Sequence, residues 1–158
     1  QIHTSAGEPV REWPTVFFLE VIRRLQMVYD CNISVICSLK EKPKYLDVCS
    51  ANSVFSELHA ASLLNKILNA DLIICNETSV SQIALVYNKI CITLLGGGHF
   101  DRFIGPSIDS EYVHATDTSC FGCNWKCVHK KLGHSAAPCV EGIQIDNVME
   151  RIEFYVTQ

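Results

Sequence analysis

Four polar residues, Asn76-Glu77-Thr78-Ser79, follow an apolar segment typical of a buried strand and precede a helical pattern. Free amides at the start of a helix attract anions, and the hydroxyl groups of Thr78 and Ser79 add hydrogen-bond donors. A carboxylate beside a phosphate would repel it, so Glu77 suits ribose hydroxyls, a sugar or a nearby arginine. The alternative is a capped helix whose glutamate is solvated.

A glycine-rich segment follows the next apolar strand and reads Gly96-Gly97-Gly98-His99-Phe100-Asp101-Arg102. Glycines let the backbone approach a ligand closely. The side chains of His99 and Arg102 can hydrogen-bond a diphosphate and neutralise its charge. The alternative is a plain flexible loop.

A third polar segment lies near the start of the chain, where Thr4, Ser5 and Gly7 precede Arg11 and a predicted helix. By its position alone, Arg11 is better explained as a surface arginine. The carboxyl ends of parallel strands share one edge of a sheet, and ligands bind at that edge. The three segments together therefore predict a site for a phosphate-bearing ligand.

Four of the nine cysteines gather in a loop over residues 116–139, at Cys120, Cys123, Cys127 and Cys139. Four thiolates suit a structural zinc ion or an iron-sulfur cluster, and His129 or His134 could replace one ligand. Disulfides and free thiols are the alternatives. The cysteines within predicted strands behave as small buried hydrophobes and favour a reducing compartment.

The elements that carry these segments alternate between helix and strand. Apolar periodicity predicts helices over about 14–28, 56–69 and 78–88, strands over 32–37, 72–75 and 90–95, and a terminal helix over 146–157 with Asp146 as its N-cap. With one more short strand between 48 and 55, the expected count is four or five. This alternation predicts an α/β fold, a Rossmann-like parallel sheet flanked by helices.

Length and composition set further limits. The 158 residues fit a single domain over 1–158, and 48% hydrophobic with 19% charged residues is a globular composition. The net charge of −4 provides no basic field, so we expect no nucleic-acid partner. Lys126, Lys130 and Lys131 could approach an anionic membrane surface, although a solvated basic loop explains them better. Because the chain starts at Gln1 without an initiator methionine, we expect a fragment of a longer protein.

Taken together, these segments resemble the C-terminal, donor-binding half of a family 9 glycosyltransferase, the lipopolysaccharide heptosyltransferase-like group with the two-domain GT-B fold. The matching motifs are Thr4-Ser5-Ala6-Gly7 with Arg11-Glu12-Trp13-Pro14, the segment from Ala70 to Ser79, and two found in a subset of relatives, Gly96 to Phe103 and Cys120 to Cys127. The resemblance covers most of the chain, with the motifs in the same order.

The resemblance implies inverting transfer of a sugar from an ADP-, UDP- or GDP-linked donor to a hydroxyl acceptor, in cell-surface glycan or lipopolysaccharide assembly. It implies a cytoplasmic protein, peripheral on the inner face of the membrane where it meets one. Arg11 would take the catalytic role of offsetting the diphosphate charge. The implied donor-binding residues are Thr4 or Ser5, Glu77, Thr78, Ser79, Gly96, Gly97, Gly98, His99 and Arg102.

Several positions depart from the family pattern. Glu77 stands where aspartate is commonest, Ser79 where glycine is, and Gln82 where a histidine is usual. The nucleoside-binding acidic residue has only Glu41 as a candidate. The general base and acceptor site belong to a missing N-terminal domain, so we expect this chain alone to be inactive. The rival interpretations are another GT-B nucleotide-sugar enzyme, such as an epimerase, and a non-catalytic metal-binding interaction module.

Overall fold

A six-stranded parallel sheet forms the centre of the computed structural model, which describes residues 1–100, 112–115, 117–124, 126–131 and 136–157. The strands are β1 (Ile2–His3), β2 (Val35–Ile36), β3 (Val54–Phe55), β4 (Ile73–Asn76), β5 (Cys91–Leu95) and β6 (Tyr112–His114). Their order across the sheet is β3-β2-β1-β4-β5-β6, and every adjacent pair is parallel. The predicted α/β, Rossmann-like class is confirmed.

The sheet grows outward in two directions from β1. Strands β2 and β3 follow on one side, and the chain then crosses back to place β4, β5 and β6 on the other side. Ile2 pairs with Val35 of β2 and with Ile74 of β4, so β1 lies between them. The direction of chain growth reverses between β1 and β4, and the crevice at their carboxyl ends is where open α/β sheets bind ligands.

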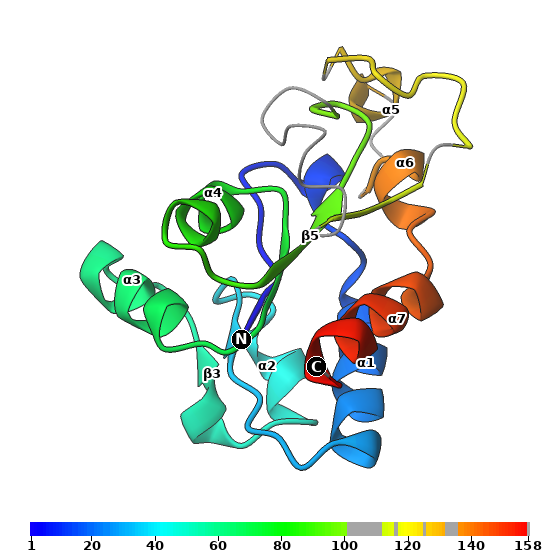
Figure 1. The fold of residues 1–158 in the computed structure, drawn as a ribbon. Helices are drawn as coiled ribbons and strands as arrows, with labels where there is room; N and C mark the ends of the chain where they lie inside the picture. The colour runs from blue at the N-terminus through cyan, green and yellow to red at the C-terminus, as the bar shows by residue number, and fades with distance from the viewer. Residues whose placement is uncertain (101–111, 116, 125, 132–135, 158) are drawn as a thin grey trace.

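Helices cover both faces of the sheet. They are α1 (Thr15–Val28), α2 (Lys42–Leu46), α3 (Ala60–Leu68), α4 (Ser79–Val86), α5 (Val128–Lys131), α6 (Pro138–Glu141) and α7 (Ile145–Val156), with 3-10 turns at Pro9–Arg11 and Ala51–Ser53. Figure 1 shows α3 and α4 on one side of the sheet and α1 with α7 on the other. No helix in the described part of the chain is long and apolar enough to cross a membrane.

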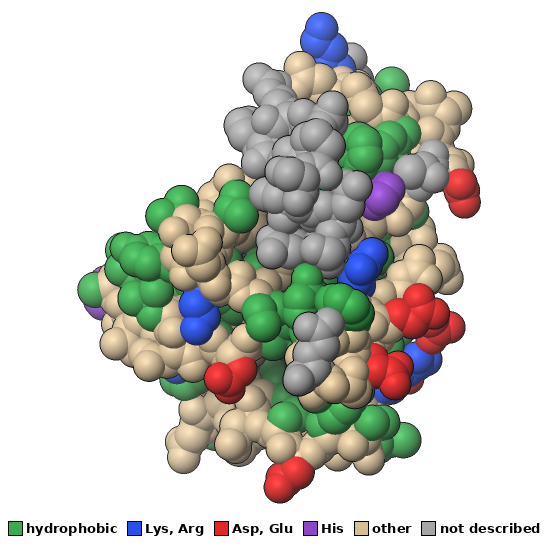
Figure 2. Space-filling view, in the orientation of Figure 1, with side chains coloured by type: hydrophobic (Ala, Val, Ile, Leu, Met, Phe, Trp, Pro, Cys, Tyr) green, Lys and Arg blue, Asp and Glu red, His purple; other side chains and the backbone are tan. Residues whose placement is uncertain are grey.

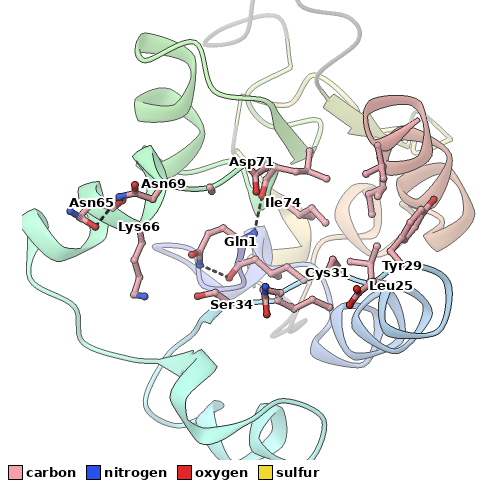
Figure 3. Close-up of a pocket in the computed structure, with 18 residues that line it drawn as sticks. Gln1, Leu25, Tyr29, Cys31, Ser34, Asn65, Lys66, Asn69, Asp71 and Ile74 are labelled. Carbon is pink, nitrogen blue, oxygen red and sulfur yellow. Dashed lines mark hydrogen bonds between the residues drawn. The ribbon is translucent and has the colours of Figure 1, made fainter. Parts of the chain in front are cut away.

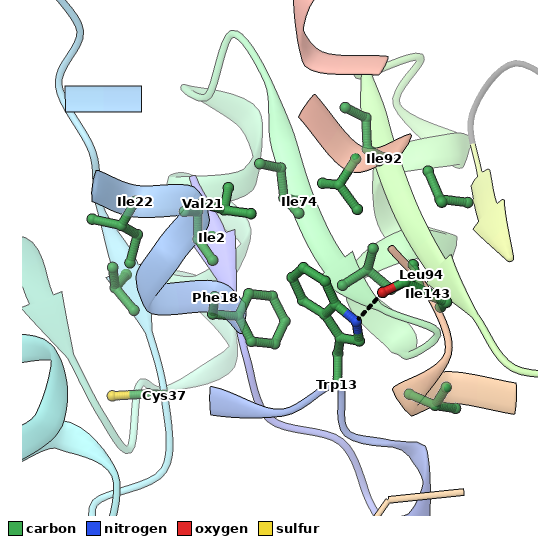
Figure 4. Packing of buried hydrophobic residues seen from close by; sticks show 14 of the residues in the cluster. Ile2, Trp13, Phe18, Val21, Ile22, Cys37, Ile74, Ile92, Leu94 and Ile143 are labelled. Atoms are coloured by element: carbon green, nitrogen blue, oxygen red, sulfur yellow. Dashed lines mark hydrogen bonds between the residues drawn. The ribbon is translucent and has the colours of Figure 1, made fainter. Parts of the chain in front are cut away.

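The two faces of the sheet build separate parts of the core. Side chains alternate along a strand, so Ile74 of β4 joins the larger cluster under α1 and α7, whereas Ile73 and Cys75 join the smaller one under α3 and α4. In the larger cluster Trp13 is 1% exposed and packs beside Phe18, as Figure 4 shows. The core thus anchors the residues immediately before α1.

Three features differ from the sequence prediction. The sheet has six strands instead of four or five: β6 is an additional short strand, and the short strand end or loop expected over residues 2–7 contains β1. The terminal helix begins at Ile145 with Gln144 as its N-cap, so the assignment of Asp146 as N-cap was wrong. The Asp146 carboxylate instead accepts a hydrogen bond from Arg24 at 2.6 Å. The region 116–139 contains α5 and the start of α6 in place of a continuous loop.

Helix α4 has apolar residues on its outer side as well as its inner side. Val80 and Ala84 are buried, whereas Leu85, Val86 and the following Tyr87 are exposed. Figure 2 shows hydrophobic side chains gathered on the side of the molecule formed by α3 and α4. This helix therefore lacks the polar outer face of an ordinary amphipathic helix.

Candidate functional site

The three polar segments that the sequence singled out meet at the carboxyl edge of the sheet. Thr4 directly follows β1, Glu77 directly follows β4, and Gly96 directly follows β5. Because β1 and β4 are neighbours at the reversal of strand order, the first two segments flank the ligand crevice. The site therefore lies where the fold itself predicts one.

Glu77 is the centre of the site. Its side chain is 8% exposed and approaches a basic residue on each side. The Arg11 guanidinium donates to the Glu77 backbone carbonyl at 2.6 Å and lies 3.5 Å from a carboxylate oxygen, while Nδ1 of His99 lies 2.9 and 2.8 Å from the two carboxylate oxygens. Of the sequence interpretations of Glu77, the structure supports the one that pairs it with an arginine.

Asn76 holds the first two segments together. Its side chain is fully buried, its Nδ2 donates to the carbonyl of Thr4 at 2.7 Å, and its Oδ1 accepts from the backbone N–H of Trp13 at 2.9 Å. Both partners are backbone groups at either end of the 4–13 segment. Asn76 therefore sets the position of Arg11, which lies between them, relative to β4.

The hydroxyl groups of Thr4 and Ser5 differ in their hydrogen bonding: that of Thr4 faces a backbone carbonyl, and that of Ser5 does not. Thr4 is 2% exposed and its hydroxyl lies 3.5 Å from the carbonyl of Ile36 on β2. The hydroxyl oxygen of Ser5 is buried and has no hydrogen-bond partner within the described residues. A buried hydroxyl without a partner is costly, so Ser5 is the better placed of the two to meet a ligand.

Thr78 and Ser79 begin α4. The Thr78 hydroxyl accepts from the amide of Val80 at 3.2 Å, and Ser81 reciprocates by accepting from the Thr78 amide at 3.3 Å, which forms a capping box. The helix cap of the alternative interpretation is thus present, but its solvated glutamate is not, because Glu77 is buried and paired. Ser79 keeps an exposed side chain.

The glycine segment packs against protein over part of its length. A Cβ at Gly97 would lie 2.7 Å from the ring of Phe121 and 3.1 Å from its Cα. The carbonyl of Gly97 accepts from the amide of Gly122 at 3.0 Å. Gly97 therefore has no room for a side chain, because Phe121 lies against it. Phe121 belongs to the segment over residues 116–139 that carries four cysteines, called the cysteine region below.

Among the other predicted residues, Arg102 falls outside the described part of the chain. Glu41 precedes α2 and accepts hydrogen bonds from the hydroxyl of Thr15 at 2.5 Å and that of Ser38 at 3.2 Å. Its carboxylate is thereby occupied within the protein.

The four clustered cysteines are neighbours without forming a metal centre. All nine cysteines lie in the described part of the chain, and each is a free thiol. Burial raises the pKa of Cys139; the Gly97 amide opposes this by hydrogen-bonding the thiol, and Cys120, Cys123 and Cys127 lie close enough to raise it further. Within the described residues, however, no group of three or more cysteine, histidine or acidic side chains could hold a metal ion. The donor atoms suit zinc or iron, and as placed here they are not drawn together around one point.

A cavity of about 640 Å³ lies at the opposite edge of the sheet. Its lining includes Gln1, Tyr29, Ser34, Lys66 and Asp71, several of which precede strands (Figure 3). The terminal ammonium of Gln1 donates to the carbonyl of Leu72 at 2.8 Å within it. None of the predicted donor-binding residues lines this cavity, so it is separate from the Glu77 site.

The fold and the site together define a Rossmann-like domain with a cluster of basic and acidic side chains at its switch point, the place between β1 and β4 where the strand order reverses. The solved structures similar to it are heptosyltransferases. The E. coli ADP-heptose lipopolysaccharide heptosyltransferase II matches with a TM-score of 0.66 and 13% identity, over 99% of this chain and 46% of that protein. The dodecameric iron-containing heptosyltransferase TibC, in complex with ADP-D-beta-D-heptose, matches with a TM-score of 0.69 and 16% identity, over 99% and 44%.

The E. coli heptosyltransferase WaaC with ADP also matches, with a TM-score of 0.59 and 14% identity, over 99% of this chain and 43% of that protein. No protein-family profile and no curated protein sequence matches the chain. At these identities the likeness establishes the fold alone, which this chain shares with part of each heptosyltransferase. The chain spans less than half the length of each of these three proteins.

Sequence reasoning missed two residues that shape the site. Asn76 was grouped with the polar turn, yet it is the last residue of the buried strand β4. An amide side chain at a buried strand end is a signal that it hydrogen-bonds backbone groups of other segments, here at Thr4 and Trp13. Phe121 was part of the cysteine motif, and nothing in the local pattern connects it with Gly97, from which it is 24 positions away.

Proposed function

We propose that this chain binds the nucleotide-sugar donor of an inverting glycosyltransferase of cell-surface glycan or lipopolysaccharide assembly. The observation that carries the proposal is the contact of Arg11, Glu77 and His99 at the switch point of the sheet. Support comes from similar structures whose titles give ADP and ADP-heptose as ligands. Among the ADP-, UDP- and GDP-linked donors expected from the sequence, we therefore favour the ADP-linked one.

The geometry explains how a carboxylate can belong to a diphosphate site. Before the donor arrives, Glu77 balances the charge of Arg11 and holds the ring of His99 by Nδ1. A diphosphate then competes for the guanidinium, while the Arg11 contact with the Glu77 carbonyl keeps the side chain in place. The hydroxyl of Ser5 supplies a neutral donor.

The chemistry requires a stabilised leaving group. In inverting transfer the acceptor oxygen attacks the anomeric carbon, the bond from that carbon to the diphosphate breaks, and the nucleoside diphosphate leaves with the added negative charge. The Arg11 guanidinium is placed to offset that charge. We assign the general base and acceptor site to an N-terminal domain, and propose action in the cytoplasm, at the inner face of the membrane for a lipid-linked acceptor.

Calorimetry with ADP, UDP and GDP tests donor binding. We expect ADP to bind most tightly and the Lys66→Ala variant to bind it equally well, because Lys66 lines the cavity at the far edge of the sheet. With ADP-heptose and an acceptor lipid, we expect no transfer by the chain alone. If none of the three nucleotides binds, the donor-site proposal fails and the interaction-module alternative is favoured; conversion of the free sugar nucleotide would instead support an epimerase.

We further propose that Cys120, Cys123, Cys127 and Cys139 bind a structural metal ion. The four soft donors within one short region support this, and one similar protein is an iron-containing heptosyltransferase. Such a metal would draw the thiolates together without entering the transfer reaction. Elemental analysis of protein purified without added metal should find about one iron or zinc ion per chain, or a cluster of iron with sulfide.

The matched test uses two serine substitutions. Cys123→Ser should remove the metal, whereas Cys31→Ser should retain it because Cys31 is exposed and outside the loop. A metal content unchanged by Cys123→Ser would contradict this assignment.

A further inference from the structure

The glycine segment is attached to the cysteine region at Gly97. The backbone of Phe121 passes so close that a Cβ at Gly97 would lie 3.1 Å from its Cα, and its ring lies closer still, at 2.7 Å. A hydrogen bond of 3.0 Å from the Gly122 amide to the Gly97 carbonyl joins the same two segments. The carbonyl of Gly97 is therefore bonded to this region.

A second attachment lies just beyond His99. The ring of Phe100 packs against that of Phe121 with 4.9 Å between centroids, and both rings lie near His114 on β6, at 5.1 and 6.1 Å. His99 thus stands between two fixed points, Gly97 and Phe100. Both points contact Phe121.

We propose that Phe121 is a positioning residue for His99, and through it for the donor site. It holds the glycine segment so that Nδ1 of His99 lies 2.8 Å from the Glu77 carboxylate, and Glu77 in turn contacts Arg11. The chain of contacts runs from Phe121 to Gly97 and Phe100, then to His99 and Glu77. The effect on donor affinity rests on the proposed function, whereas the effect on His99 does not.

The glycine at position 97 is thus needed for close packing against Phe121, not for close approach to a ligand. A side chain there would push the glycine segment away from Phe121 or displace the cysteine region. Either movement changes the position of His99, since only Gly98 separates it from Gly97. The packing of the cysteine region against Gly97 therefore affects the position of His99 beside Glu77.

The experiment combines NMR of the His99 ring with ADP calorimetry on Gly97→Ala, Phe121→Ala and the double variant. Gly97→Ala should shift the His99 ring signals, assigned with His99→Ala, and weaken ADP binding by roughly threefold to thirtyfold. The double variant should resemble Phe121→Ala alone, because removing the ring removes the two closest contacts with the new methyl group. In a His99→Ala background, Gly97→Ala should cause little further loss of affinity.

Gly142→Ala is the matched control. A Cβ at Gly142 would also be crowded, at 2.9 Å from the carbonyl of Pro138, but it touches no residue of the glycine segment. It should lower the thermal midpoint while leaving the His99 signals in place. If neither Gly97→Ala nor Phe121→Ala moves those signals, the proposal is overturned. If the signals move but wild-type protein binds no nucleotide, positioning stands and the donor function fails.

Discussion

Replacing Trp13 with alanine is expected to lower the free energy of unfolding by about 3–5 kcal/mol, the usual cost of deleting a large buried aromatic side chain. Trp13 is 1% exposed, and its ring lies 5.3 Å from that of Phe17 and 5.0 Å from that of Phe18. Its Nε1 donates to the carbonyl of Ile143 at 3.1 Å, which ties the start of α1 to the segment before α7. Chemical denaturation measures the loss directly.

Two variants separate the components of this effect. Trp13→Phe keeps most of the aromatic packing but removes the donor to Ile143, so we expect a loss nearer 1–3 kcal/mol. Phe154→Ala deletes an aromatic ring that is 48% exposed and should change stability by about 0.5 kcal/mol or less. A loss below about 1 kcal/mol for Trp13→Ala would show that Trp13 does not anchor the core as described.

The longer elements could be predicted because periodicity accumulates along them. The spacing of Val16, Leu19, Ile22 and Leu25 predicts α1, which ends at Val28 as expected. The buried face is Phe18, Val21, Ile22 and Leu25, and Val16 is 63% exposed. Strands β1 and β6 have two and three residues, which is too few for a period of two to stand out. They exist because neighbouring strands supply hydrogen bonds, as when the Ile2 amide donates to the carbonyl of Ser34.

The sequence predicts where the candidate site lies more readily than it predicts which of its residues contact one another. Strand ends in a parallel sheet must share an edge, which is why Arg11, Glu77 and His99 could be grouped from sequence. Their pairing depends on the crossover that places β4 next to β1, and 66 positions separate Arg11 from Glu77. No local pattern encodes that neighbour relation.

The cysteine motif and the glycine segment were treated as independent because they are far apart in the sequence. The structure joins them through Gly97 and Phe121, and the Gly122 amide donates to the carbonyl of the same glycine. The two motifs thus meet in the folded chain. Each supplies half of one packed interface.

Arg11→Ala is expected to weaken ADP binding by about 10-fold to 150-fold, since hydrogen bonds to charged groups typically contribute about 1.5–3 kcal/mol. The guanidinium is 21% exposed at the crevice and is held by the Glu77 carbonyl at 2.6 Å. Its loss removes the cation that we propose contacts the diphosphate, and it leaves the Glu77 carboxylate with His99 but without its arginine. Calorimetry at fixed salt concentration measures the change in affinity.

The controls for Arg11 distinguish local geometry from overall charge. Arg24→Ala removes the same charge from α1, where Arg24 pairs with Glu20 and Asp146, and should leave ADP affinity nearly unchanged. Arg11→Lys keeps the charge but lacks the planar fork that contacts the Glu77 carbonyl and a phosphate together, so its affinity should fall between wild type and Arg11→Ala. Equal losses for Arg11→Ala and Arg24→Ala would mean that net charge alone attracts the nucleotide, and the donor site would have to be placed away from Glu77.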